Sequence, residues 1–289
     1  MHLLQHVLVA MLSAAAGFAQ SAPGFEAASV KPAASTSARQ SLRGGPGSGD
    51  PARITYTNAT LMAVLLRAYD VKAYQAIGPD WLSSQRYDIA AKIPPGTTKE
   101  QFQRMLQTLI AERFHLVLHH ETREIQGFAL SIARNGPKLK PAAASSAAGQ
   151  NQPDSAGPPR VDASGFPILP APGMEIMEGV RGRSVISFLT AKSQPVAALC
   201  EMLSKEFRMP IRDKTGLGGK FDFTLEFAPQ PPGALAATPP GDPVPTAADD
   251  SGPNLTSAVQ QQLGLRLSPA KIATDILVVD RADRVPVEN

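Results

Sequence analysis

The chain has 289 residues, of which 43% are apolar, and it carries 27 prolines, 23 glycines and a net charge of +3. This length allows one large domain or two small ones, and so many prolines and glycines argue against a single compact block. A protein that binds nucleic acid gathers Lys and Arg on one face, with aromatic residues between them. Here the basic residues are scattered, so the sequence argues against a nucleic-acid partner.

The first residues are typical of a secretion signal. An apolar run covers 3–16, apart from Gln5, His6 and Ser13, and a small-x-small cleavage site follows at 17–19. A buried N-terminal helix is the alternative interpretation of this run. No stretch approaches the ~20 apolar residues of a membrane-spanning helix. We therefore expect a signal peptide over 1–19 and a soluble mature protein in the periplasm or outside the cell.

In the first half of the chain, apolar periodicity predicts alternating strands and helices. The expected strands are Phe25–Lys31, Ile54–Thr57, Arg86–Ile93, Phe114–Glu121 and Gly127–Ala133. One expected helix is Leu61–Tyr69 with Thr60 as its N-cap, and a second opens with a Thr97–Glu100 capping box. The Ser/Gly/Pro-rich stretch 32–51 is predicted to be a mobile loop.

A linker over 141–172, rich in Ala, Ser, Gly and Pro, precedes the second half. Beyond it the expected helices are Val196–Phe207 and Thr256–Leu263, and the expected strands are Arg183–Thr190, Phe221–Phe227, Leu265–Leu267 and Asp275–Val279. A Pro/Ala-rich insertion interrupts this half at 228–253. The second half thus has the same succession of elements as the first.

A shared pattern indicates an internal duplication. A basic residue, an aromatic residue and an aspartate open the strand at Arg86 and again at Lys220, an offset of about 134 residues. The sequence therefore predicts an α+β fold of two similar repeats, 20–140 and 173–289. Each repeat would be a small mixed sheet with two helices on one face, and the disordered linker would join them.

Four blocks of sequence resemble a large secreted family of unknown function that is best known from soil acidobacteria. The blocks are Phe25–Pro32, Ala68–Pro94, Met105–Lys140 and Asp213–Phe227. The resemblance implies no catalytic residues, because the family has no established activity. In some members a similar domain is joined to a membrane metallopeptidase of the antibiotic-sensor type, whose membrane helices and His-Glu-x-x-His motif are missing here.

Each half also resembles, in pattern alone, the short N-terminal module of secretins and TonB-dependent receptors. The clearest instance is Gln260–Val279, where a helix ending in Gly-Leu precedes a strand pair. Such modules bind other envelope proteins, often through an exposed sheet edge. This resemblance therefore implies protein interaction.

The tetrapeptide Asp213–Gly216 (Asp-Lys-Thr-Gly) occurs in two classes of enzyme. It matches the phosphorylated motif of P-type ATPases and contains the Lys-Thr-Gly of penicillin-binding enzymes, with Ser268 and Lys271 at Ser-x-x-Lys spacing. The chain has no membrane domain for the first, and Ser268 follows the motif instead of preceding it for the second. A structural role is favoured, in which Asp213 and Thr215 hydrogen-bond the backbone of a turn.

Other candidate residues also favour structural roles. His115 and His119 would lie roughly 13 Å apart along a strand, too far to share a metal, and His119 with Glu121 gives only two ligands. Cys200 shares a helix face with Val196, Leu199 and Leu203, which predicts a core residue. No metal site and no cofactor are therefore expected.

Two further features allow both a structural and a functional interpretation. Trp81, beside a Gly-Pro turn, is expected to anchor the core, although it could also stack on a ligand. Asp88 and Asp222 are equivalent in the two repeats, and acid–base work by the pair would need an arrangement that brings them together. If the protein binds a ligand, the candidate residues are Trp81, Asp213 and Thr215.

These patterns predict an exported, non-catalytic binding or protein-interaction module of the cell envelope, with another envelope or secreted protein as its partner. Two alternatives stay open. One is an extracytoplasmic hydrolase assembled from distant residues such as His119, Asp213 and Ser268. The other is a detached ligand-sensing domain. A deep pocket that joins a hydroxyl or thiol to a histidine would favour the hydrolase, and an exposed edge strand would favour interaction.

Overall fold

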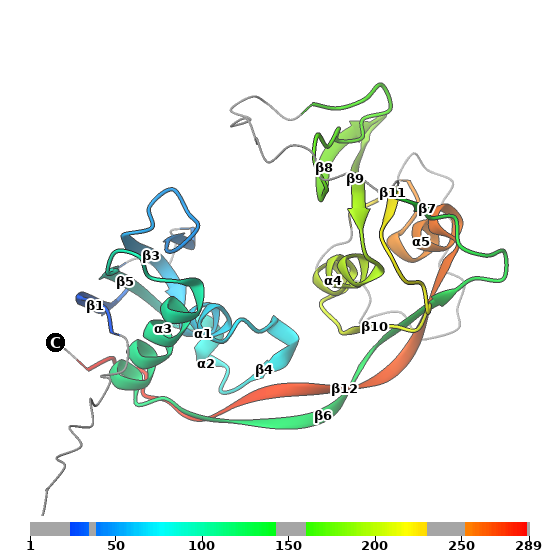
Figure 1. Ribbon diagram of the computed structural model, residues 1–289. Helices are drawn as coiled ribbons and strands as arrows, with labels where there is room; N and C mark the ends of the chain where they lie inside the picture. Colours follow the sequence, from blue (N-terminus) through cyan, green and yellow to red (C-terminus); the bar gives the residue numbers. More distant parts are fainter. Residues whose placement is uncertain (1–23, 35–38, 143–159, 230–251, 288–289) are drawn as a thin grey trace, which may run out of the picture. The chain divides into compact units, whose positions relative to one another are not determined.

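The computed structural model describes residues 24–34, 39–142, 160–229 and 252–287 (Figure 1). The chain divides into two compact units whose ranges interleave. The first comprises Met1–Asp70, Pro79–Val117 and Asp280–Asn289, and the second comprises Val71–Gly78 and Leu118–Val279. The class is α+β, as predicted, and no described helix is long and apolar enough to cross a membrane.

The first unit is an antiparallel sheet with two long helices. Its strands stand in the order β1 (Ala27–Pro32), β5 (Arg86–Lys92), β3 (Arg53–Thr60) and β2 (Ser41–Gly44). Its helices are α1 (Leu61–Tyr69), the short α2 (Trp81–Ser84) and α3 (Lys99–Phe114). Figure 1 shows α1 beside α3, and their facing residues form a buried core. Thr60 caps α1 as predicted, since its side chain accepts a hydrogen bond from the Ala63 N–H.

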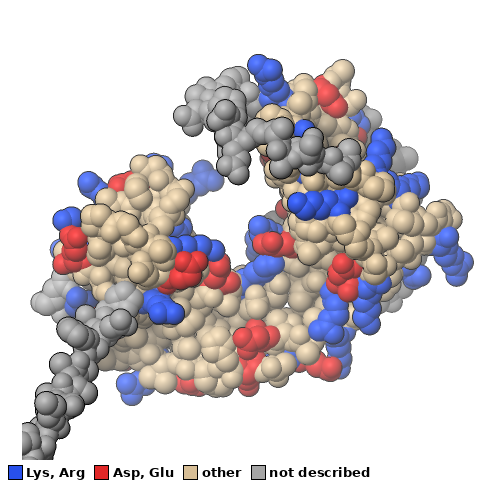
Figure 2. All heavy atoms as spheres, viewed as in Figure 1, with Lys and Arg blue, Asp and Glu red and all other residues tan. Residues whose placement is uncertain are grey.

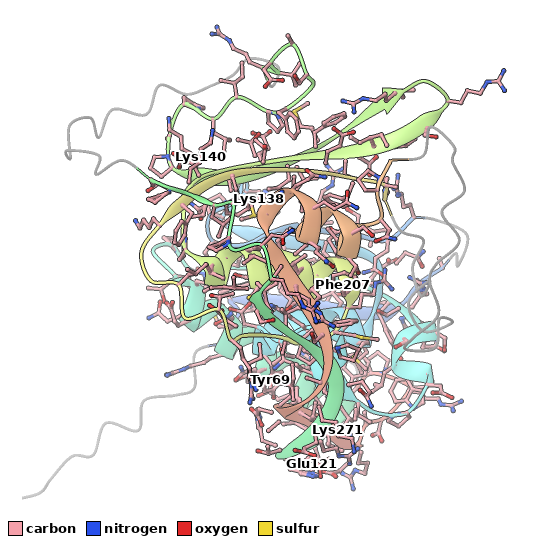
Figure 3. The ribbon with its side chains drawn as sticks, turned by 90° about the vertical axis from the view of Figure 1, so that its right-hand side faces the viewer. Tyr69, Glu121, Lys138, Lys140, Phe207 and Lys271 are labelled. Carbon is pink, nitrogen blue, oxygen red and sulfur yellow. The ribbon has the colours of Figure 1, made fainter. Side chains whose placement is uncertain are left out.

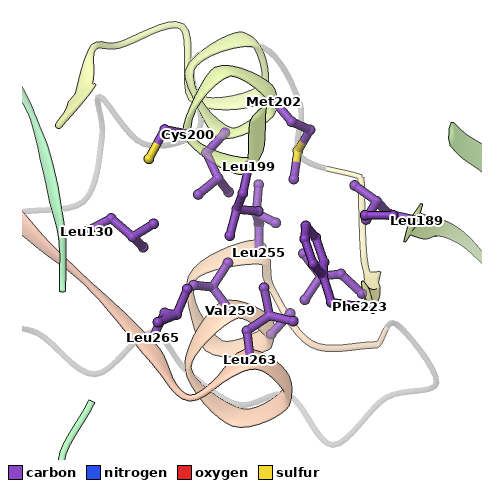
Figure 4. Packing of buried hydrophobic residues seen from close by; sticks show 14 of the residues in the cluster. Leu130, Leu189, Leu199, Cys200, Met202, Phe223, Leu255, Val259, Leu263 and Leu265 are labelled. Carbon is purple, nitrogen blue, oxygen red and sulfur yellow. The ribbon is translucent and has the colours of Figure 1, made fainter. Parts of the chain in front are cut away.

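The described residues of the second unit form two sheets and two α-helices. One sheet has the order β7 (Lys140–Pro141), β11 (Phe221–Phe227), β9 (Ser184–Gln194) and β8 (Gly173–Arg181). The other has the order β10 (Ile211–Asp213), β6 (Val117–Ile132), β12 (Leu265–Arg281) and β4 (Ala76–Ile77), which follows the 3₁₀ turn η1 (Ala73–Gln75). The helices α4 (Val196–Phe207) and α5 (Leu255–Leu263) enclose the core that Figure 4 shows.

Several boundaries differ from the prediction. Phe114 ends α3 and His115 is its left-handed cap, so the strand expected from Phe114 begins at Val117. The capping box is formed by Thr98 and Gln101 instead of Thr97 and Glu100. The two pairs of short strands expected after α3 and after α5 are the single long strands β6 and β12.

The structure also differs from the predicted loop and the predicted linker. The predicted mobile loop 32–51 contains β2, which pairs with β3. The predicted linker 141–172 is described at 141–142, where Pro141 belongs to β7, and at 160–172. In the second range the Asp162 carboxylate closes a turn, and Phe166 packs edge-on against Phe188 of β9. The ends of the insertion meet, because the Ala228 N–H donates to the Pro253 carbonyl at 2.9 Å. The expected signal peptide lies outside the described residues.

The two antiparallel sheets share a local hydrogen-bond arrangement. In each, the central pair of strands contains an irregularity, and an aspartate Oδ1 accepts the N–H of a residue with positive φ. Asp88 accepts from Asn58 at 2.8 Å in the first unit, and Asp222 accepts from Ser193 at 2.6 Å in the second. These features support the predicted duplication, which stays a prediction. They also give both aspartates a structural role in the backbone.

Candidate functional site

The strand β8 forms a free edge of its sheet. All nine residues pair antiparallel with β9, from Gly173 opposite Lys192 to Arg181 opposite Ser184. Among the described residues, no strand pairs with the other side of β8. A long edge strand presents unpaired N–H and C=O groups, and natural proteins usually protect such an edge with charges, bulges or proline. β8 has neither a proline nor a bulge, and its charged residues are Glu175, Glu178 and Arg181.

Apolar side chains accompany this edge. Ile176 is 37% exposed, Val180 is 75% exposed and Val185, which pairs with Val180, is 49% exposed. Side chains alternate between the two faces of a strand, so Met174, Ile176 and Val180 share one face. This is the face of the sheet that packs against α4, because the β9 partners of Met174 and Ile176 are buried in the same core as the residues of α4.

A groove runs between this face of β8 and the helix α4. Its volume is about 370 Å³, and its apolar lining is Met174 and Ile176 of β8 with Ala198 and Met202 of α4. Ala198 and Met202 are four residues apart and therefore lie on one helix face. Methionine side chains are flexible and polarisable, so they adapt to the shape of a bound apolar group. We call this site the β8–α4 groove.

The polar rim of the β8–α4 groove is mainly acidic. Glu201, Lys205 and Glu206 line it, and Lys205 pairs with Glu201 at 3.7 Å. Desolvation, together with the nearby charge of Glu178, raises the pKa of Glu206. In the described part of the chain neither Glu178 nor Glu206 has an ion-pair partner. These two unpaired carboxylates, Glu178 on β8 and Glu206 on α4, favour a partner that brings a positive charge.

Each of the two units carries both positive and negative side chains on its surface. On the face that Figure 2 shows, each unit carries Lys and Arg side chains as well as Asp and Glu side chains. The acidic rim of the β8–α4 groove is therefore a local feature.

The predicted binding residues Asp213 and Thr215 are engaged within their own turn. Asp213 Oδ1 accepts from the Thr215 N–H at 2.8 Å and from the Thr215 hydroxyl at 2.7 Å. Thr215 Oγ1 in turn accepts from the Leu217 N–H at 3.2 Å. These contacts match the structural role that the sequence favoured for the motif.

Trp81 lies in the other unit, where it begins α2 and is partly exposed. The guanidinium of Arg284 lies 5.8 Å from the centre of its ring, a distance at which cation–π attraction operates. Trp81 and the Asp213 turn thus belong to different units.

The residues of the alternative hydrolase are distant along one sheet. Asp213 of β10 pairs with Leu130 of β6, and His119 precedes Leu130 by eleven residues. At a rise of ~3.3 Å per residue, this separation is about 36 Å along the strand. Ser268 follows Arg266, whose carbonyl accepts from the Ser131 hydroxyl, so it too lies towards the Leu130 end. A catalytic base must lie within hydrogen-bond reach of its nucleophile, and His119 does not.

The other histidines and the cysteine have structural surroundings. His115 pairs with Asp283 at 2.7 Å, and His120 pairs with Asp275 at 3.0 Å. No group of three or more His, Cys, Asp or Glu side chains suited to a metal occurs in the described ranges. Cys200 is buried as predicted, and its burial, with the charge of Asp213, raises the pKa of its thiol to about 12. The reactive thiolate is therefore scarce near neutral pH.

Sequence reasoning did not find the β8–α4 groove. From the sequence, the stretch 173–181 is assigned to no element, and Met177 and Glu178 interrupt its alternation of apolar and polar residues. The run of Met174, Ile176 and Val180 at every second or fourth position was the available signal.

Comparison with known proteins identifies a family and no function. The sequence model of DUF3738, described as a protein of unknown function, matches residues 62–282. No curated protein and no solved structure matches the chain.

Proposed function

The chain belongs to the DUF3738 family of proteins of unknown function, and from that premise we propose that it is a binding module for an extended segment of another protein. The observation that carries the proposal is the free nine-residue edge of β8 beside the β8–α4 groove. A site between an edge strand and a helix suits a peptide that adds to the sheet as a further strand.

Strand addition would use three features of this site. The partner backbone would pair with the free N–H and C=O groups of β8, which supplies affinity without reading sequence. Every second side chain of the partner would enter the groove between Ile176 and Met202, which favours apolar residues there. A lysine or arginine on the same face would lie near Glu178 and Glu206, and this pairing would supply charge selectivity.

We further propose that the protein acts after export, in the periplasm or outside the cell. The apolar run at 3–16 and the small-x-small site at 17–19 support export. The partner would then be another envelope or secreted protein. Neither a cofactor nor a metal enters this proposal.

A matched pair of peptides tests the proposal. The first is Thr-Val-Thr-Val-Thr-Lys-Thr with blocked ends, which places two valines and the lysine on one face, and the second replaces the lysine with glutamate. The lysine peptide should bind about three- to tenfold more tightly in calorimetry, because each exposed ion pair contributes ~0.2–1 kcal/mol. The double substitution Glu178→Lys, Glu206→Lys should reverse the preference.

Two controls distinguish strand addition from nonspecific binding of the peptide. Glu124→Lys changes an exposed glutamate of β6 outside the groove, and it should leave the preference unchanged. A lysine peptide with alternate amides N-methylated should lose binding, because it cannot complete the backbone pairing. Equal binding of the methylated peptide, or the same preference in the double variant, would contradict the proposal.

A further inference from the structure

The second unit has another pocket, apart from the β8–α4 groove, and the charged residues that line it are mainly basic. Its volume is about 520 Å³, within the range of small-molecule sites. Three lysines line it, from the segment before β7, from β7 itself and from β9: Lys138, Lys140 and Lys192. Its apolar walls include Ile168, Leu169, Phe223 and Leu263. We call it the lysine pocket.

Two of the lysines are held in place by backbone carbonyls. Lys138 Nζ donates to the Gln261 carbonyl at 2.7 Å, and Lys192 Nζ donates to the carbonyls of Leu169 and Pro170 at 3.2 and 3.3 Å. Carbonyls position an ammonium group without cancelling its charge. Lys140 lies on the strand that pairs with β11, and its side-chain ammonium group has no hydrogen-bond or ion-pair partner among the described residues. Figure 3 shows Lys138 and Lys140 on the same stretch of chain.

Among the described residues one carboxylate lines the lysine pocket, and it already accepts a hydrogen bond from the backbone. Asp222 Oδ1 accepts the Ser193 N–H at 2.6 Å, as described above. Three ammonium groups against one carboxylate leave an excess of positive charge. The field of the lysine pocket therefore favours an anion.

An unsatisfied hydroxyl gives an independent indication of a ligand. The Oγ1 atom of Thr190, which lines the lysine pocket, is buried and has no hydrogen-bond partner among the described residues. Buried polar atoms without a partner are uncommon, and one that lines a pocket suggests a missing partner. A carboxylate or phosphate oxygen would accept the hydrogen bond that this hydroxyl can donate.

We propose that the lysine pocket binds a small organic anion, with a carboxylate or phosphate head and an apolar body. The head would lie near the lysines and Thr190 Oγ1, and the body would lie against Leu169 and Leu263. This site is distinct from the β8–α4 groove, so either could fail its test while the other passes.

Calorimetry of the full chain with decanoate, decanol and inorganic phosphate tests the proposal. Decanoate has both parts of the ligand, and each other probe lacks one. Decanoate should bind, while decanol and phosphate should each bind at least about tenfold more weakly. Equal affinity for phosphate would show that the site recognises charge alone, and equal affinity for decanol would show that it recognises apolar surface alone. Either result would overturn the proposal.

Three substitutions complete the test. Lys140→Met should weaken decanoate binding about tenfold, whereas Lys271→Met, at an exposed position outside the lysine pocket (Figure 3), should not change it. Thr190→Val removes the unpartnered hydroxyl at nearly constant volume. It should leave the Tm of the free protein unchanged or higher, and reduce the rise in Tm that decanoate produces. Unchanged decanoate binding by Lys140→Met would overturn the proposal.

Discussion

Replacing Leu199 with alanine should lower the free energy of unfolding of the second unit by about 2–5 kcal/mol. Leu199 is fully buried, and Figure 4 shows it pointing from α4 towards Leu255 and Val259 of α5. Its removal loses apolar burial and leaves a cavity between two helices that cannot close freely. Because α4 and α5 share this buried cluster, the loss of the Leu199 side chain should destabilise the second unit as a whole.

Urea unfolding followed by circular dichroism measures this change, with Gln260→Ala as the matched control. Gln260 is exposed on α5, and an alanine there keeps the helix propensity, so its effect should stay within about 0.5 kcal/mol. A Leu199→Ala protein as stable as the control would mean that α4 and α5 do not share a packed core.

Replacing Asp222 with alanine should cost about 1.5–3 kcal/mol, because a hydrogen bond to a charged acceptor is lost. Its carboxylate accepts the N–H of Ser193, a residue with a φ of +53° at the irregularity between β9 and β11. Without the carboxylate, a partly buried N–H loses its partner in a conformation that non-glycine residues adopt rarely. Asp222→Asn should cost less, because the amide oxygen can still accept.

The same substitutions at Asp88 form the internal comparison. Asp88 accepts the N–H of Asn58, which has a φ of +54°, so Asp88→Ala should destabilise the first unit by a similar amount. Thermal unfolding of the four variants measures both units. Ser193→Gly should be neutral or stabilising, because glycine adopts positive φ without strain. An Asp222→Ala protein with unchanged stability would contradict the structural role.

Local signals predicted much of the fold. The bounds of α1 and α4 were predicted to the residue, because Thr60 and Pro195 mark helix starts. The strand predicted to open at Lys220 is β11, which begins one residue later. In α3 the predicted cap was Thr97, and the structure uses its neighbour Thr98. Such signals act within a few residues, so one sequence suffices to find them.

Long-range pairing could not be predicted. β6 and β12 were split because exposed polar residues interrupt their apolar pattern, yet hydrogen bonding within one sheet keeps each continuous. At Gly127 of β6 a Cβ atom would lie 2.3 Å from the Pro210 carbonyl oxygen, so glycine there permits a close approach that no local pattern reveals. For the same reason the interleaved ranges of the two units differ from the contiguous ranges that the sequence suggested.

The candidate residues also include a part that local signals predict and a part that depends on long-range pairing. The turn of Asp213 and Thr215 is local, and its hydrogen bonds follow from residue types two positions apart. The β8–α4 groove depends on the register between β8 and β9 and on the packing of α4, which the sequence does not specify. The partner chemistry that we propose, an extended chain with a basic residue, rests on that geometry.

Amide hydrogen exchange of β8, followed by NMR with and without the lysine peptide, tests the central claim most directly. If the peptide adds as a strand, the β8 amides that do not pair with β9 should exchange at least about tenfold more slowly in its presence. The amides of α3 and β5, in the other unit, should keep their rates. Bound peptide with unchanged exchange along β8 would contradict the claim that this edge accepts another strand.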